Sequence, residues 1–104
     1  MVDTNYSKVP VDYMVEGVRL YIEHGVPPGH FLTALFSNNL MESYKRADEN
    51  NTAAMQRWVA FMYWEMPNPS QGSPERVAAW IKMGGLRGLA EAEAAAATEA
   101  EDNC

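Results

Sequence analysis

Cysteine is almost absent from this sequence of 104 residues: the only one is Cys104, so no disulfide can form within the chain. No run of apolar residues approaches the roughly 18 that a membrane-spanning helix needs. The first ten residues also lack the basic segment followed by an apolar one that marks a secretory signal peptide. These absences predict a cytoplasmic protein that does not associate with a membrane.

Motifs for catalysis and for cofactor binding are missing as well. The sequence has no P-loop, no dinucleotide fingerprint, no paired cysteines for zinc and no nucleophile motif around its serines. We therefore expect a protein that is not an enzyme and that holds no cofactor and no metal. Eight lysines and arginines against 14 aspartates and glutamates give a net charge of −6. Without a basic stripe to contact phosphates, nucleic acid is not the expected partner.

The negative charge is concentrated at one end of the chain. Residues 86–104 hold one arginine and five acidic residues, a net charge of −4, so residues 1–85 carry only −2. Because this segment is rich in alanine and glutamate and has few large apolar residues, we predict a mobile tail, either disordered or a frayed helix. We interpret it as a solubilising extension rather than as a mimic of nucleic acid or a holder of a basic partner. Residues 1–9 are predicted to be a flexible N-terminus, and residues 10–85 form the one predicted domain.

What the chain does contain is apolar residues, which make up 47% of the sequence. Many of them recur at helical spacing. This pattern predicts an all-α fold, a compact bundle of four to five short helices. The first helix is expected to begin at Pro10 and to end at Gly25, before two prolines that prevent its continuation. Its apolar stripe consists of Val11, Met14, Val15, Val18 and Ile22.

The second helix is expected to begin near Gly29, with Phe31, Leu32, Leu35 and Phe36 on its apolar face. The sequence SNNL at 37–40 then leaves two alternatives, because serine and asparagine favour caps over helix interiors. Either Asn38 or Asn39 caps a new helix over 40–48, which we prefer, or one bent helix runs over 30–48. The apolar positions of this new helix would be Leu40, Met41 and Tyr44.

The last two helices of the predicted bundle follow polar connectors. Asn50 or Asn51 is expected to cap the first of them. The second begins at Ser73, Pro74 and Glu75, since a capping hydroxyl, a proline and a carboxylate each suit a first turn, and it ends at Gly84-Gly85. In the earlier helix the residues expected in the core are Met55, Trp58, Val59 and Met62, with Met66 continuing the stripe.

Tyr63 and Trp64 lie off that predicted core stripe. Two interpretations remain open for them: burial against the last helix, or contact with a partner. Because amphipathic aromatic residues are enriched at protein interfaces, we weigh contact with a partner equally with burial against the last helix. The helix is apolar around much of its circumference, and this also makes self-association into a homo-oligomer plausible.

The stretch EHGVPPGHF at 23–31 carries both histidines of the chain. Glu23, His24 and His30 are ligand types that zinc accepts, but their spacing matches no zinc site, so we predict no metal there. The helix start at Gly29, His30 and Phe31 points free backbone N–H groups outward, which suits a phosphate or a carboxylate. The alternative hypothesis for this chain is therefore a small-ligand protein that binds or sequesters a nucleotide or another anion.

Two segments, VRLYIEHGVPPGHFLTALFSNNLMESYKRADENN and GSPERVAAWI, resemble a family of small uncharacterised proteins encoded by bacteriophages and prophages. In that family a phrase similar to HGIPPGSFLTAVLSNDL leads to an Ala-Asp connector, and Gly-Ser-Pro opens the last helix. The resemblance covers roughly residues 11–82. His30 stands where the family often has serine, and Asn39 where it often has aspartate. The resemblance implies a phage accessory protein in the cytoplasm of the host cell, and it implies no particular chemistry.

Small phage products without enzymatic activity often bind and disable a host component. The resemblance therefore favours a protein that binds a host protein, with inhibition of a host defence system as one form of that function. The residues expected to contact this partner are Val26, Pro27, Pro28, His30, Tyr63 and Trp64.

Overall fold

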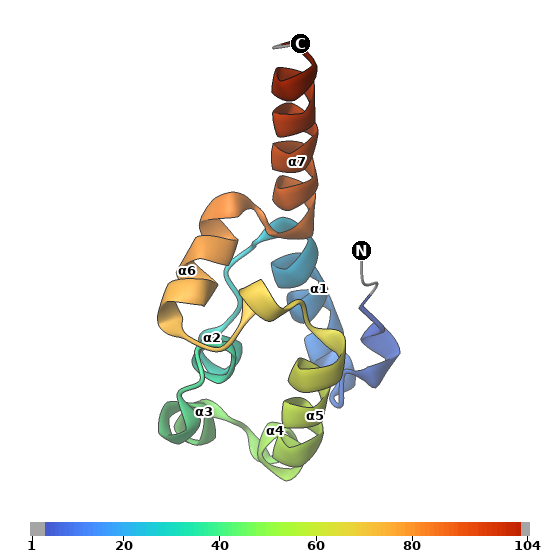
Figure 1. Ribbon diagram of the computed structural model, residues 1–104. Coiled ribbons are helices and arrows are strands. Elements are labelled where there is room, and N and C mark those ends of the chain that lie inside the picture. Colours follow the sequence, from blue (N-terminus) through green and yellow to red (C-terminus); the bar gives the residue numbers. More distant parts are fainter. Residues whose placement is uncertain (1–3, 103–104) are drawn as a thin grey trace.

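The computed structural model describes the backbone of residues 4–102 and the side chains of residues 4–95, and within these residues every regular element is a helix (Figure 1). In chain order the elements are η1 (Tyr6–Lys8), η2 (Asp12–Met14), α1 (Val15–His24), α2 (His30–Phe36), α3 (Leu40–Arg46), α4 (Glu49–Ala53), α5 (Met55–Glu65), η3 (Asn68–Ser70), α6 (Pro74–Met83) and α7 (Gly85–Asp102). The predicted all-α bundle is confirmed. It contains one more short helix than expected before α7, because the predicted fourth helix is two helices, α4 and α5.

The start of α1 differs from the prediction and its end agrees with it. The helix begins at Val15 rather than at Pro10, because Val11 is extended and buried in the core. The residues between them form the short turn η2. At the other end Gly25 adopts the left-handed conformation with φ of 67°, and its N–H donates to the Tyr21 carbonyl at 2.9 Å. Glycine allows this conformation without strain, as expected of a C-terminal cap.

The second and third helices are separate, which confirms the preferred alternative for residues 37–40. Asn39 caps α3, since its side-chain oxygen accepts from the Glu42 N–H at 3.2 Å. Ser73 caps α6 in the predicted manner and accepts from the Arg76 N–H at 3.1 Å. The prediction for α4 was wrong: its cap is Asp48, two or three residues before the expected asparagines, and Asp48 accepts from the Asn51 N–H at 2.8 Å.

The core lies between α1, α2, α5 and α6, and buried hydrogen bonds fix how these helices meet. The Trp80 indole N–H on α6 donates to the Tyr21 carbonyl on α1 at 3.0 Å. In turn the Tyr21 hydroxyl donates to the Ser70 carbonyl at 2.6 Å. Burial raises the pKa of the Tyr21 phenol, so this hydroxyl remains a donor. The Trp58 indole N–H on α5 donates to the Asn51 side chain at 3.0 Å, so that buried polar groups are paired.

Helix α7 leaves the body where two glycines of distant segments touch. A Cβ at Gly85 would stand only 2.6 Å from the Gly25 nitrogen, so the end of α1 and the start of α7 meet backbone to backbone. From there α7 projects away from the other helices (Figure 1), and the molecule measures 56 × 25 × 19 Å. Its backbone is helical through Asp102, so of the two forms predicted for the tail, disordered or helical, the structure has the helix. The mobility of the tail stays a prediction. Cys104 lies outside the described residues.

The N-terminal segment contacts the rest of the fold in its described part, residues 4–9, while its flexibility stays a prediction. The Thr4 hydroxyl donates to the Glu65 carbonyl at 3.0 Å, and Val9 is buried in the core. Between them η1 is capped by the Asn5 side chain, which accepts from the Ser7 N–H at 3.1 Å. These contacts place the N-terminal segment beside the end of α5.

Candidate protein-binding surface

One side of α5 faces solvent although it carries large apolar side chains. Val59 is 56% exposed, Tyr63 72% and Trp64 73%. The Tyr63 and Trp64 rings contact each other edge to face, with centroids 4.8 Å apart. Of the two interpretations that the sequence left open for Tyr63 and Trp64, the structure therefore has them exposed rather than buried against the last helix. We call Val59, Tyr63 and Trp64 the outer face of α5.

The Tyr63–Trp64 pair separates two hollows. The hollow on the Trp64 side, which we call the basic hollow, has a volume of about 500 Å³ and lies between η1 and α5; Lys8, Val9, Arg57, Phe61, Trp64 and Glu65 are among the residues that line it. On the Tyr63 side, a hollow of about 210 Å³ lies between α3 and α5 and is lined mainly by apolar residues, including Leu40, Met55, Val59, Met62 and Tyr63. An aromatic ridge between two hollows offers a partner both a large apolar contact and recesses for its own side chains.

Several residues expected at apolar positions of the helices are exposed instead. Val59, expected in the core, is exposed, and Phe61 takes the core position. On α3 the expected apolar positions Leu40, Met41 and Tyr44 are all exposed. The predictions for Met55 and Trp58 are confirmed, since both are buried, and Met62 is half-buried.

The error at Val59 has a geometric cause. Successive residues of a helix are separated by 100°, so Trp58 and Phe61 point to within about 60° of each other, whereas Val59 points about 100° from Trp58. Trp58 forms an apolar stripe with either Phe61 or Val59, because α5 is apolar on nearly every side. The spacing of Val59 and Tyr63, four residues apart, was the available signal for a second stripe.

The residues of the proline turn do not join the outer face of α5. Val26, Pro27, Gly29 and His30 are exposed, and Pro28 is half-buried. Neither of the two hollows beside Tyr63 and Trp64 is lined by turn residues. His30 instead lines a separate hollow of about 260 Å³ with Glu42 and Arg46. The structure thus places the expected contact residues in two groups.

The anion site at Gly29, His30 and Phe31 stays a prediction. It depends on the backbone N–H groups of this helix start and on His30, because the Phe31 side chain is buried in the core. The Glu42 carboxylate lines the same hollow as His30 and is held by Arg46 at 2.8 Å. That ion pair lowers the pKa of Glu42, and it places one negative and one positive side chain in the hollow that His30 lines.

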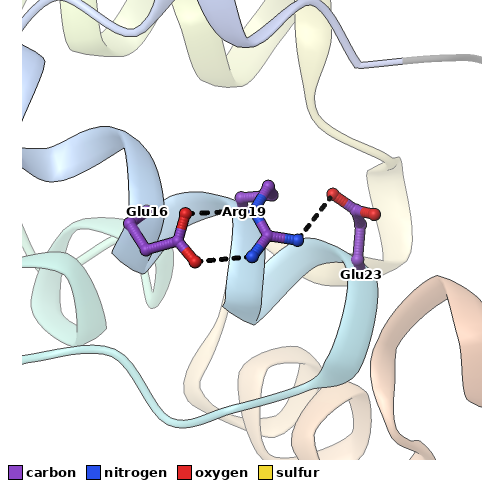
Figure 2. Close-up of polar contacts among 3 residues, drawn as sticks. All are labelled: Glu16, Arg19 and Glu23. Atoms are coloured by element: carbon purple, nitrogen blue, oxygen red, sulfur yellow. Dashed lines mark hydrogen bonds and ion pairs between the residues drawn. The ribbon is translucent and has the colours of Figure 1, made fainter.

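The Glu23 carboxylate, at the start of the proline turn, belongs to a polar cluster on α1. Arg19 lies between two glutamates, 2.5 Å from Glu16 and 3.7 Å from Glu23 (Figure 2). The hydrogen bond from Arg19 lowers the pKa of Glu16, and burial together with Glu23 raises the pKa of Tyr6. Glu23 is therefore engaged by an arginine on its own helix. Within the described residues no group of three or more histidine, cysteine, aspartate or glutamate side chains is placed to hold a metal ion.

Comparison with known protein families, with curated proteins and with solved structures finds no match to this chain. Among the described helices, none combines the length and the apolar character needed to span a membrane.

Proposed function

We propose that this chain is a non-enzymatic phage or prophage accessory protein that binds a host protein through the outer face of α5. The observation that supports this most strongly is the exposure of Tyr63 and Trp64, at 72% and 73%, side by side on a helix whose other side is packed in the core. Tyrosine and tryptophan are the residues most often found to dominate binding energy in protein interfaces.

The apolar surface extends beyond the outer face of α5, which favours a binding site over a few apolar residues that are exposed singly. Single exposed apolar residues are ordinary, but a contiguous group is a mark of an interaction site. Here Leu40 on α3 and Val59 on α5 line the same hollow as Tyr63, so the apolar surface continues from one helix to the next. The resemblance to phage-encoded proteins supports a host protein as the partner, and inhibition of a defence system is the form of that function we favour.

The test is affinity capture from a lysate of the host bacterium, with bound proteins quantified by mass spectrometry. We compare the wild-type chain with Trp64→Ala, with Tyr63→Ala and with Lys82→Ala, an exposed control on α6. At least one host protein should be retained by the wild type and by Lys82→Ala, and its affinity should fall about thirtyfold with Trp64→Ala, as loss of a central aromatic residue costs about 2 kcal/mol. A set of bound proteins that is the same for all four chains would refute the proposal.

The turn is tested in the same experiment by Pro28→Ala. If the partner also covers Val26, Pro27, Pro28 and His30, this variant weakens capture of the protein that Trp64→Ala loses. If the partner contacts α5 alone, Pro28→Ala binds as the wild type does. Far-ultraviolet circular dichroism of each variant checks that the helices are intact.

A further inference from the structure

The basic hollow has a charge that differs from the rest of the molecule. Lys8 and Arg57 both line it, and within the described part of the chain neither forms an ion pair. Arg19, Arg46 and Arg87 each have a glutamate partner, whereas Lys45, Arg76 and Lys82, like Lys8 and Arg57, form no ion pair with a described residue. Two unpaired cations thus meet at one recess of a chain whose net charge is −6.

One carboxylate also lines this hollow, and it does not pair with the cations. The Glu65 side chain accepts from the Asn5 N–H at 3.3 Å, on the N-terminal segment. With two cations and one carboxylate the hollow remains positive. Its other lining groups are apolar or aromatic, with Val9 and Phe61 buried beneath and Trp64 exposed at the edge. This combination fits an acidic segment that also presents small apolar side chains.

The chain itself carries such a segment in α7. After Arg87 the sequence contains only acidic charges, beginning with Glu91 and Glu93, separated by alanines. The side chains of residues 90–95 are exposed. The helix points away from α5 (Figure 1), which forms one wall of the basic hollow, so we expect it to enter such a hollow on another molecule. The first part of α7 packs on α1 and α6, and contact with a second molecule adds packing for the exposed residues that follow.

We propose that the basic hollow binds the acidic α7 of a second copy of this chain. Glu93 and Glu91, which exchanges its exposed pair with Arg87, lie near Lys8 and Arg57 of the other molecule, and Ala92 between them packs against Trp64. The occupant differs from the host protein of the proposed function, so the two proposals can fail independently. Because exposed ion pairs are individually weak, the association depends on protein concentration and weakens with added salt.

Sedimentation velocity of the full chain over a range of concentrations tests this self-association. Lys8→Gln/Arg57→Gln removes the cations of the hollow, and Lys45→Gln/Lys82→Gln removes two cations outside it with the same change in net charge. Glu91→Gln/Glu93→Gln removes the charges of the occupant and retains good helix formers. We expect the hollow variant and the α7 variant each to raise the dissociation constant about tenfold, as loss of two exposed ion pairs implies, and the control to leave it unchanged.

A charge exchange makes the test specific to this pair of surfaces. Lys8→Glu/Arg57→Glu and Glu91→Lys/Glu93→Lys should each remain monomeric alone, because hollow and helix then have the same sign. Mixed together they should associate, because each hollow meets a helix of opposite charge, although both variants keep a net negative charge. The Trp64 fluorescence should shift to shorter wavelength in the mixture as the indole leaves water.

A wild-type chain that stays monomeric at the highest concentration it tolerates would overturn the proposal. So would an association that the control weakens as much as the hollow variant does, or a mixture of the exchanged variants that does not associate. If one of these results is found while capture of a host protein still depends on Trp64, the self-association is refuted and the proposed function is not. Self-association that follows the predicted pattern, with no host protein dependent on Trp64, supports this inference and refutes the proposed function.

Discussion

The two sides of α5 carry the same kinds of residues in opposite environments. Trp58 is completely buried, at 0% exposure, while Trp64 on the same helix is 73% exposed. Phe61 packs edge to face on Trp58 with centroids 6.2 Å apart, and Tyr63 packs edge to face on Trp64. The comparison teaches that residue type alone does not distinguish core from interface. What distinguishes them is the presence of other helices on one side and solvent on the other.

The polar atoms of the two tryptophans show the same contrast. Trp58 donates its indole N–H to Asn51, a buried side chain, so the core side of α5 is satisfied within the fold. The Trp64 indole forms no hydrogen bond with any described residue, and water or a partner can accept from it. The polar group on the core side is thus paired within the fold, whereas the one on the outer face has no partner among the described residues.

The largest effect in this comparison is expected from Trp58→Ala. Removing a fully buried indole leaves a cavity among Phe31, Phe61 and the neighbouring helices, which should lower the free energy of unfolding by about 3–5 kcal/mol. Urea denaturation followed by circular dichroism measures this change. A loss below about 1 kcal/mol would mean that Trp58 is not in the core, since that is the range of surface substitutions.

The next effect concerns the partner of Trp58. Asn51→Ala leaves the buried indole N–H without an acceptor, and we expect the free energy of unfolding to fall by about 1–3 kcal/mol. Thr52→Ala, at an exposed position on the same helix, is the control and should have little effect. The double variant Asn51→Ala/Trp58→Phe has no indole N–H to leave unpaired. Its loss of unfolding free energy should therefore be smaller than the sum of the losses of Asn51→Ala and Trp58→Phe measured singly. Simple additivity would show that the hydrogen bond contributes nothing.

A smaller effect depends on pH and acts through the cap of α4. Tyr13 donates to Asp48, and the Asn51 N–H does so too; both lower the pKa of Asp48 below its ordinary value of 3.8. A carboxyl with a lowered pKa in the folded state stabilises the fold above its unfolded pKa, and this contribution is lost as pH falls through the folded value. The wild type should therefore lose stability in acid below about pH 4 more steeply than Asp48→Asn, which keeps a capping oxygen. Thermal melts at several pH values measure the slopes, and parallel slopes would contradict this account.

The smallest effect on stability is expected on the outer face. Trp64→Ala should change the free energy of unfolding by no more than about 0.5 kcal/mol, because the side chain is exposed. Acrylamide quenching of tryptophan fluorescence provides a second measurement. Most of the accessible fluorescence of the wild type should disappear in Trp64→Phe, since Trp58 and Trp80 are buried. Equal quenching in both chains would show that Trp64 is sheltered.

Local signals in the sequence predicted the all-α fold and several helix ends. Gly25 and Ser73 were identified correctly, and Asn39 was one of two candidates, because a cap acts on its own helix and needs no knowledge of the rest of the chain. Asp48 was missed since three neighbouring polar residues can all cap, and only the tertiary contact between Asn51 and Trp58 selects among them.

The candidate site was predictable only in part. Tyr63 and Trp64 were recognised as departures from the core stripe, but the role of Val59 was not, because α5 is apolar on several sides. The basic hollow could not be foreseen, since Lys8 and Arg57 are far apart in sequence. They come together because Val9 is buried in the core and because Thr4 and Asn5 bind the end of α5. Contacts of this kind are set by how elements pack and leave no periodic pattern in the sequence.

Photo-crosslinking from position 63 in host cells tests the central claim most directly, that the outer face of α5 is a binding surface. Tyr63 is replaced by a benzophenone-bearing phenylalanine, and Ala78, an exposed position on α6, carries the same group as the control. We predict a covalent adduct with a host protein from position 63 and none with that protein from position 78. The absence of any host adduct at position 63, or the same adducts from both positions, would contradict it.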